Sequence, residues 1–286
     1  MVDKWKRRNI EDFKEIIIKE HANGKSLKEI CDVVGFYPDK ISKFLKSIGL
    51  KPNRNNKTKW VNEHYFDEID CEEKAYILGY FIADGCIREE YDKRDGGVRN
   101  RLCFSNSVDD SEIIKYIHDN LCPYNKIQYT NNKTGSKNRK PQISLQWTSR
   151  VMVKTLKEKF GIQPRKTFDT DFIFPFELIN EKYHRDFIRG FIDGDGTFSK
   201  EDLRFVFNSP LFAKQIIDIL YENVYLKNKE YMYDFKYTLT ETNGKKTKYW
   251  RVRIPTGHGK YKFYRKYLYE GASLFLIRKR DKVYNE

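Results

Sequence analysis

The chain has 286 residues and a formal net charge of +14, with 55 Lys and Arg side chains. This length provides for a sizeable core and more than one domain, and the charge makes a nucleic acid the first partner to consider, because a polyanion offsets the self-repulsion of such a surface. An anionic lipid surface would also attract the chain, but the charge is spread along it and no apolar run approaches the roughly 20 residues of a membrane span.

The N-terminal residues and the cysteines predict a protein that is not secreted. The first eight residues lead into Asn9 without the apolar core of a signal peptide. The five cysteines are odd in number and widely spaced, with no Cys-x-x-Cys pair, which predicts reduced thiols and neither zinc nor disulfides. We expect a cytoplasmic location, or the nucleus or an organelle of a host.

Residues 1–50 are predicted to form a small all-α helix-turn-helix domain. Three short helices are expected at 11–22, 26–34 and 39–48, and Ser26 with Glu29 makes a capping box for the second. The third helix would enter the major groove of DNA. It would present Lys40, Ser42, Lys43 and Lys46. A helical bundle without a ligand is the alternative interpretation.

Residues 51–65 are predicted to be a basic linker, since residues 51–59 are polar and nearly free of apolar side chains. An extended basic segment can follow phosphates or a minor groove, which makes Arg54 and Lys57 candidate DNA contacts. A plain tether is an equally good interpretation.

Residues 66–286 contain an internal repeat. The string Ile-Leu-Gly-Tyr-Phe-Ile-Ala-Asp-Gly at 77–85 returns, altered, as Ile-Arg-Gly-Phe-Ile-Asp-Gly-Asp-Gly at 188–196. Two such strings predict a duplicated domain with halves at 66–165 and 166–286. Asp70 and Glu73 are expected to cap the first motif helix, and Gly85 to end it.

Both halves are predicted to follow one α+β plan, αββαββα. In the first half, strands are expected at 98–105, 126–131 and 142–148, and helices at 109–121 and 150–160. In the second half, strands are expected at 203–208, 230–240 and 248–255, and helices at 210–221 and 260–269. Asn106-Ser107 and Asn208-Ser209 recur just before the middle helix, which is independent support for duplication.

The small residues of each motif lie four apart, at Gly79 and Ala83 and at Gly190 and Gly194. On a helix this spacing makes a smooth stripe along which two backbones can approach. Crossing the helices there would bring Asp84 and Asp195 to one end of the interface. Two adjacent carboxylates repel unless a cation lies between them, and Mg²⁺ is the first hard divalent ion to expect.

Both strings resemble the nine-residue signature of the LAGLIDADG homing endonucleases. The resemblance implies that Asp84 and Asp195, at the eighth position, bind Mg²⁺ or Mn²⁺ and act in catalysis. It also implies two halves that form a DNA-binding saddle of antiparallel sheets. The sixth position, usually acidic in the family, is Ile82 in one copy and Asp193 in the other, a departure at a residue on which the family does not depend for metal.

The family also places a basic residue just after the last helix of each half. Lys166 and Lys279 match these positions and are the candidates for stabilising charge and ordering water, with Arg165 and Arg278 as alternatives. An ordinary solvated lysine is the competing interpretation. Ser107 and Ser209 match the polar position that ends the second strand.

Alternation along the strands predicts where DNA would lie. Ile143, Leu145 and Trp147 point one way, and polar side chains point the other. Arg, Gln, Ser and Thr suit base edges and phosphates, although a solvated sheet face would look similar in any single strand. The candidate DNA contacts are Arg99, Arg101, Gln128, Gln142, Ser144, Gln146, Arg204, Asn208, Lys236, Arg251 and Arg253.

The resulting prediction is a site-specific, metal-dependent endonuclease that makes a staggered cut in double-stranded DNA. The resemblance implies a long asymmetric target, a monomer with two fused halves, and a role in intron or element mobility. An RNA-splicing maturase, with RNA as partner, and a non-cleaving DNA-binding regulator are the alternatives on the same scaffold. Retention of both Asp84 and Asp195 favours catalysis.

Overall fold

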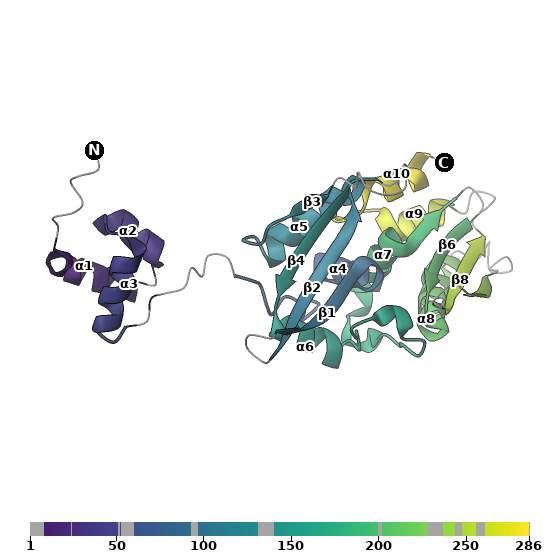
Figure 1. Ribbon diagram of the computed structural model, residues 1–286. Coiled ribbons are helices and arrows are strands. Elements are labelled where there is room, and N and C mark those ends of the chain that lie inside the picture. Colours follow the sequence, from purple (N-terminus) through teal and green to yellow (C-terminus); the bar gives the residue numbers. More distant parts are fainter. Residues whose placement is uncertain are drawn as a thin grey trace. The chain divides into compact units, whose positions relative to one another are not determined.

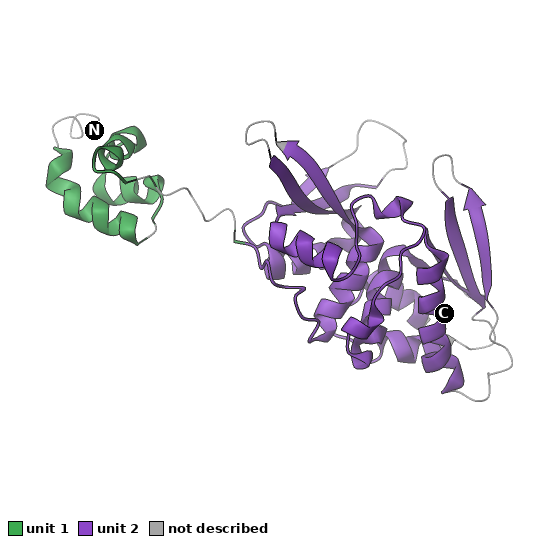
Figure 2. Cartoon of the chain, turned by 90° about the horizontal axis from the view of Figure 1, so that it is seen from below, with its two compact units in different colours: residues 1–60 green, residues 61–286 purple. Residues whose placement is uncertain are grey.

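The computed structural model describes residues 9–23, 25–50, 52, 60–92, 97–130, 140–199, 202–227, 237–243, 248–255 and 261–285. The chain divides into two compact units, residues 1–60 and residues 61–286 (Figure 2). The candidate contacts Arg54, Lys57 and Lys236 lie outside the described residues. Tyr65, which the sequence prediction placed in the linker, is buried in the core of the larger unit.

The smaller unit contains η1 (Ile10–Phe13), α1 (Lys14–Ala22), α2 (Leu27–Val34) and α3 (Pro38–Ser47). The predicted capping box is confirmed: Glu29 N–H donates to Ser26 Oγ, and Ser26 N–H donates to Glu29 Oε2. Gly35 then adopts a left-handed φ of 71° that ends α2. The core of the unit consists of Ile17, Ile30, Val34, Phe36, Ile41, Phe44 and Leu45. On α3, Lys40, Lys43 and Lys46 are exposed and Ser42 is half-buried.

The larger unit contains two four-stranded sheets in which every pair of neighbouring strands is antiparallel. The first has the order β1-β2-β4-β3 and the second β5-β6-β8-β7. The strands are β1 (Gly85–Asp92), β2 (Gly97–Ser107), β3 (Gln128–Thr130), β4 (Gln142–Thr148), β5 (Gly196–Phe198), β6 (Asp202–Phe207), β7 (Thr238–Asn243) and β8 (Lys248–Pro255). The repeated order confirms the predicted α+β duplication.

The two motif helices, α4 (Glu72–Asp84) and α7 (His184–Asp195), lie between the sheets (Figure 1). The other helices are α5 (Ser111–Leu121), α6 (Arg150–Glu158), α8 (Pro210–Leu220) with its π-helical extension η7 (Tyr221–Leu226), α9 (Tyr261–Tyr269) and α10 (Ile277–Asn285). Short 3₁₀ turns are η3 (Val108–Asp110), η4 (Lys166–Phe168), η5 (Phe176–Leu178) and η6 (Glu181–Tyr183). None of the helices in these described segments is long and apolar enough to span a bilayer.

Two details of the prediction were wrong, one at the start of α4 and one after the last long helix of each half. Asp70 and Glu73 do not cap α4: Cys71 is the N-cap, without a side-chain bond, Asp70 pairs with Lys74, and Glu73 accepts a bond from Ser273. Helix α10 was not predicted, and the corresponding place after α6, just past residue 165, holds the single turn η4. The two halves therefore differ after their last long helix.

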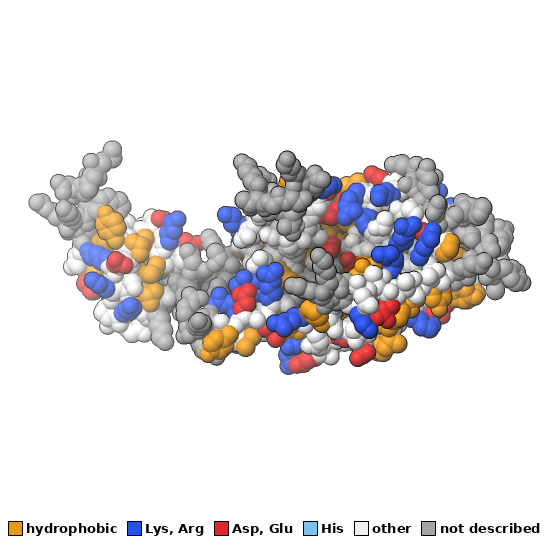
Figure 3. All heavy atoms as spheres, turned by 45° about the vertical axis from the view of Figure 1, so that its right-hand side comes forward, with side chains coloured by type: hydrophobic (Ala, Val, Ile, Leu, Met, Phe, Trp, Pro, Cys, Tyr) orange, Lys and Arg blue, Asp and Glu red, His pale blue; other side chains and the backbone are white. Residues whose placement is uncertain are grey.

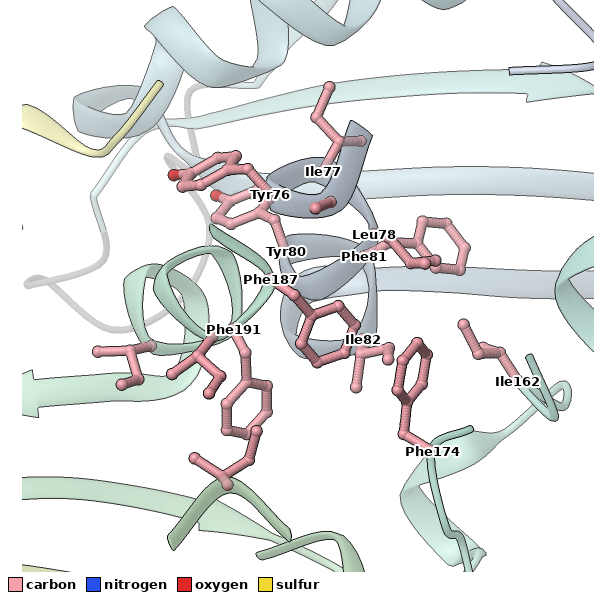
Figure 4. Close-up of a cluster of buried hydrophobic side chains, with 14 of the residues drawn as sticks. Tyr76, Ile77, Leu78, Tyr80, Phe81, Ile82, Ile162, Phe174, Phe187 and Phe191 are labelled. Atoms are coloured by element: carbon pink, nitrogen blue, oxygen red, sulfur yellow. The ribbon is translucent and has the colours of Figure 1, made fainter. Parts of the chain in front are cut away.

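The core surrounds the motif helices. Every residue from 75 to 82 of α4 is buried, as expected for a helix that is packed on all sides. Figure 4 shows Tyr76 and Tyr80 of α4 on one side of the two helices and Phe187 and Phe191 of α7 on another. The predicted alternation of β4 is confirmed, since Ile143, Leu145 and Trp147 are all buried against this core.

One prediction about the cysteines was also wrong. Cys86 of β1 and Cys103 of β2 are direct cross-strand partners with Cα atoms 5.3 Å apart, and they form a disulfide. Spacing along the chain gives no sign of this pair, because the contact arises from strand register. Cys31, Cys71 and Cys122 are free thiols.

Candidate active site at the ends of the motif helices

The motif helices meet through their glycines. A Cβ added at Gly79 would collide with the backbone carbonyl of Phe187, and one added at Gly190 would collide with the carbonyl of Tyr76. The two contacts are reciprocal, as expected for equivalent helices that cross backbone to backbone. Glycine inside a helix costs about 1 kcal/mol relative to Ala, and this close approach is what the glycines permit.

The same crossing brings the two motif acids together. One turn further along, Gly194 lies against Ala83, and its Cβ position is 3.3 Å from the Asp84 carboxylate. Asp195 follows directly, and burial together with the nearby Asp84 raises the pKa of Asp195 to about 6. Both acids are half-buried, so an external ligand can reach them.

Asp84 has hydrogen-bonding neighbours from its own half. Asn106, near the end of β2, donates through Nδ2 to Asp84 Oδ2 at 2.8 Å and to the Tyr80 hydroxyl at 3.0 Å. Burial raises the pKa of Asp84, while Lys166, Tyr80 and Asn106 oppose that shift. Asn106 Oδ1 is buried and has no hydrogen-bond partner among the described residues.

Asp195 has different surroundings. It lines a hollow of about 260 Å³ together with Lys166, Asn208 and Tyr249. Asn208 occupies the place of Asn106 in the repeat, but its amide donates to the Lys248 carbonyl at 2.8 Å. The residue at the place of Tyr80 is Phe191, which has no hydroxyl.

The two predicted lysines lie at the C-terminal ends of the motif helices. Lys166 Nζ donates to the carbonyls of Phe81 and Ala83 at 2.9 Å, and to that of Ile82. Lys279 Nζ donates to the Gly196 carbonyl. Such cations offset the helix dipole at an end where a carboxylate is unfavourable. Lost hydration lowers the pKa of each lysine to about 8.

The structure also places the alternative cations and the two serines. Arg278 forms a two-bond ion pair with Asp110, and Arg165 is exposed in a left-handed conformation with φ of 59°. Ser107 and Ser209 cap the elements that follow them, η3 and α8. The residue that reaches the carboxylate is Asn106, one position before Ser107. Sequence reasoning missed it because a shift of one residue in a strand changes the face, although the repeated Asn-Ser pair was a visible signal.

The polar side of the first sheet carries most of the predicted contacts of that half. Strand register pairs Arg101 with Thr148, Ser105 with Ser144 and Ser144 with Gln128. Arg101 also contacts Gln146 at 3.2 Å and Glu90 at 3.0 Å. Arg99 and Gln142 have the same strand parity, so the register brings all of these predicted side chains to one face.

The second sheet holds two of its predicted arginines on one buried acid. Arg204 of β6 and Arg253 of β8 are cross-strand partners, and both bond to Asp202, whose side chain is fully buried. Ser199 also donates to Asp202, at 2.7 Å. Arg251 is exposed two residues before Arg253, on the same side of β8. Figure 3 shows Lys and Arg side chains in groups on one face of the larger unit, with Asp and Glu among them.

The oxygen atoms at the helix ends could hold a divalent cation. Within the described part of the chain no group of three or more His, Cys, Asp or Glu side chains is placed so that it could hold a metal ion. The available donors are the carboxylates of Asp84 and Asp195 and the unpaired oxygen of Asn106. This set suits Mg²⁺, which is commonly bound by one or two carboxylates together with substrate phosphates and water.

Comparisons with known proteins give similarity to solved structures only. No protein-family model matches the chain, and no curated protein matches it. Similar solved structures include I-DmoI in complex with DNA and Mn, at 15% identity and a TM-score of 0.46, covering 70% of this chain and 97% of that chain. The homing endonuclease I-WcaI bound to its DNA recognition sequence has 16% identity and a TM-score of 0.45, covering 83% and 96%. The LAGLIDADG meganuclease I-AabMI bound to uncleaved DNA has 13% identity and a TM-score of 0.37, covering 67% and 83%. At such identities, function has to be argued from the residues of this chain itself.

Proposed function

We propose that the protein is a site-specific DNA endonuclease that uses divalent metal to hydrolyse one phosphodiester in each strand. The observation that carries the proposal is the meeting of Asp84 and Asp195 at the crossing of two equivalent helices. Neither helix alone would make a site with two carboxylates. One acid from each half also matches the need for two cuts in a duplex.

The faces of the two sheets support DNA as the substrate. In the first half the register gathers Arg, Gln, Ser and Thr on one side of the sheet, with the apolar side against the core. Such side chains donate to and accept from base edges, and the arginines also contact phosphates. A long target follows from two sheets in one chain, and an asymmetric one follows from their different side chains. A single chain with both halves can act as a monomer.

The donor set fits Mg²⁺ or Mn²⁺, held by Asp84 and Asp195 with the Asn106 oxygen nearby. When bound, such an ion lowers the pKa of a water and stabilises charge on the phosphate oxygens. The protein contributes the placement of the acids, and Asn106 orients the Asp84 carboxylate through its amide. Lys166 and Lys279 add positive charge beside the scissile phosphates. Their bonds to helix-end carbonyls keep that charge in a fixed position.

Substitution of the two acids tests this function. Asp84→Asn and Asp195→Asn should each reduce double-strand cleavage by about 100-fold or more, because the ion's Lewis-acid effect is worth several kcal/mol. Binding to the same duplex should change little. The substrate is first identified by selecting cleaved duplexes from a random library with Mg²⁺, and cleavage is then followed on plasmids.

The matched control is Asp218→Asn, which removes an exposed carboxylate that pairs with Lys214 on the same helix. It should cut as the wild type does, and EDTA should stop every variant. Undiminished cleavage by both acid variants would refute the assignment. Selection of bound but uncut DNA would instead favour a regulator, and activity on intron RNA would favour a maturase.

The smaller unit is proposed to be a helix-turn-helix that adds contacts to the target. Its third helix exposes Lys40, Lys43 and Lys46 on the side away from Ile41, Phe44 and Leu45. Deleting residues 1–59 should weaken DNA affinity but leave metal-dependent cleavage at high protein concentration. An equal affinity with and without these residues would contradict the proposed role of this unit.

A further inference from the structure

The segment that carries Lys279 is held by hydrogen bonds to two buried carboxylates. The backbone N–H of Leu276 donates to Asp193 Oδ2 at 2.8 Å. Two residues later, Arg278 bonds to both oxygens of Asp110, at 2.5 and 2.8 Å. Asp193 is fully buried, and the side chain of Asp110 is 5% exposed. Lys279 follows directly and reaches the Gly196 carbonyl.

The two carboxylates come from different halves. Asp110 lies in η3 of the first half, whereas Asp193 lies in α7 of the second. Asp193 also accepts bonds from the hydroxyls of Tyr76 at 2.8 Å and Tyr269 at 2.7 Å. Tyr76 belongs to α4, so Asp193 joins the first motif helix, the end of α9 and the start of α10 at one point. Burial raises the pKa of Asp193, and the three donated bonds oppose that shift.

Among the described residues, no buried carboxylate bonds in this way to the segment around Lys166. The residue at the place of Asp193 is Ile82, and η4 stands where the second half has α10. Lys166 instead bonds directly to three carbonyls of α4. Lys279 makes one such bond, to the Gly196 carbonyl, so its position also depends on the contacts that Leu276 and Arg278 make.

We propose that Asp110 and Asp193 are positioning residues for Lys279, and that they make cleavage of one DNA strand depend on contact between the two halves. The proposal rests on the proposed endonuclease function. Neither carboxylate needs to touch DNA or metal, since each acts through the backbone or side chain of the 276–279 segment. Charge-assisted, two-bond pairs such as Arg278 with Asp110 restrict direction as well as distance, which suits them to this role.

The first test measures the segment itself, in protein without metal or DNA. Hydrogen exchange of the backbone amides at 276–280 should be slow in the wild type and at least tenfold faster in Asp110→Asn and in Asp193→Asn. Both substitutions keep the size of the side chain. Asp281→Asn is the matched control, because Asp281 pairs with its neighbour Arg280 on the same helix. Unchanged exchange in both variants would overturn the proposal.

The second test measures cleavage of each strand of a supercoiled plasmid that carries the selected target. Asp110→Asn should slow one strand about tenfold, so that nicked circles accumulate, while DNA affinity stays within about twofold. Arg278→Lys should slow the same strand less than Asp110→Asn does, because it keeps the charge opposite Asp110. Equal slowing of both strands, in step with a lower Tm, would mean a general loss of stability and would also overturn the proposal.

If an aspartate variant does not fold, Arg278→Lys replaces it in the exchange experiment. This variant keeps the charge but loses the two-bond geometry, so the 276–280 amides should still exchange faster than in the wild type. A wild-type protein that cuts no DNA would refute the endonuclease function. The exchange measurement would then still decide whether Asp110 and Asp193 hold the segment.

Discussion

Asp84 and Asp195 end equivalent helices in the two halves, but their neighbours differ. Asp84 accepts a bond from Asn106 and lies beside the Tyr80 hydroxyl. At the equivalent places around Asp195 stand Asn208, whose amide is turned to the Lys248 carbonyl, and Phe191. The halves thus share the placement of the acid and differ in what holds it.

This difference separates two requirements of a duplicated site. Backbone contact through Gly79 and Gly190 must be symmetric, because each helix provides the surface against which the other packs. Hydrogen bonds to the acids carry no such constraint, since the bond from Asn106 to Asp84 is made within one half. A single chain with two halves can therefore diverge in its polar contacts while its helix interface stays equivalent.

The symmetric helix crossing should give the largest change in stability when it is disturbed. Gly79→Ala and Gly190→Ala should each lower the free energy of unfolding by about 3 kcal/mol, because the new methyl group would collide with a backbone carbonyl. Urea denaturation measures the change. Gly97→Ala is the control, since among the described residues its methyl group would meet only the Arg150 guanidinium, at 3.9 Å. A wild-type stability for Gly190→Ala would contradict the close crossing.

The hydrogen bonds that Asp84 accepts should affect the cleavage of one DNA strand more than the other. Tyr80→Phe makes the first site resemble the second and removes a hydroxyl that helps to hold Asn106 and Asp84. Cleavage of one strand should slow about tenfold, since a hydrogen bond to a charged group is worth about 1.5–3 kcal/mol. Accumulation of nicked plasmid measures this slower cleavage. Tyr264→Phe, which removes a buried hydroxyl bonded to that of Tyr225, should leave both strands unaffected. Equal slowing of the two strands by Tyr80→Phe would argue against the difference between the sites.

The buried charge of Asp195 should reduce stability in the metal-free protein. Its pKa is raised to about 6 by burial and by Asp84, whereas an unfolded Asp titrates near about 3.9. The folded state then binds more protons between these pH values, so stability falls as pH rises from about 4 to about 6. Asp195→Asn should therefore raise the Tm at pH 7.5 by roughly 2 °C or more.

That gain should disappear below pH about 4, where Asp195 is protonated in both states. Asp193→Asn is the contrast within the same helix. It should lower the Tm, because an amide N–H₂ would face one of the three donors that Asp193 now accepts. A Tm lowered by Asp195→Asn would contradict the expected cost of its charge.

The smallest effect should come from the sheet faces. Asp202→Asn should weaken DNA affinity about fivefold, which is about 1 kcal/mol, because it loosens Arg204 and Arg253 together. Glu90→Gln should change affinity less than twofold, since Glu90 pairs with Arg101 at the surface and such pairs contribute little. Titrations of the selected duplex at one salt concentration measure the DNA affinities of the two variants. A larger effect at Glu90 would reverse the expected order.

The sequence was sufficient for most of the long elements, but not for helix α10 or for every side chain near the site. Strand β4 and the capping box at Ser26 were predicted because hydrophobic alternation and capping depend on residues close in the chain. Near the end of β2 the residue chosen was off by one: Ser107 was predicted, but Asn106 is the residue that bonds to Asp84. The DNA-contact roles of the sheet residues and of α3 stay predictions.

The sequence by itself determined that two similar helices exist, that each bears a stripe of small residues, and that each ends in Asp-Gly. Only the tertiary structure decided that Cys86 faces Cys103, that Arg278 pairs with Asp110, and that Asp193 joins three separate elements. The physical reason is the distance along the chain between the residues that interact. Helix and strand periodicity are set by neighbours a few residues away, whereas these contacts depend on strand register and on the way helices far apart in the chain cross.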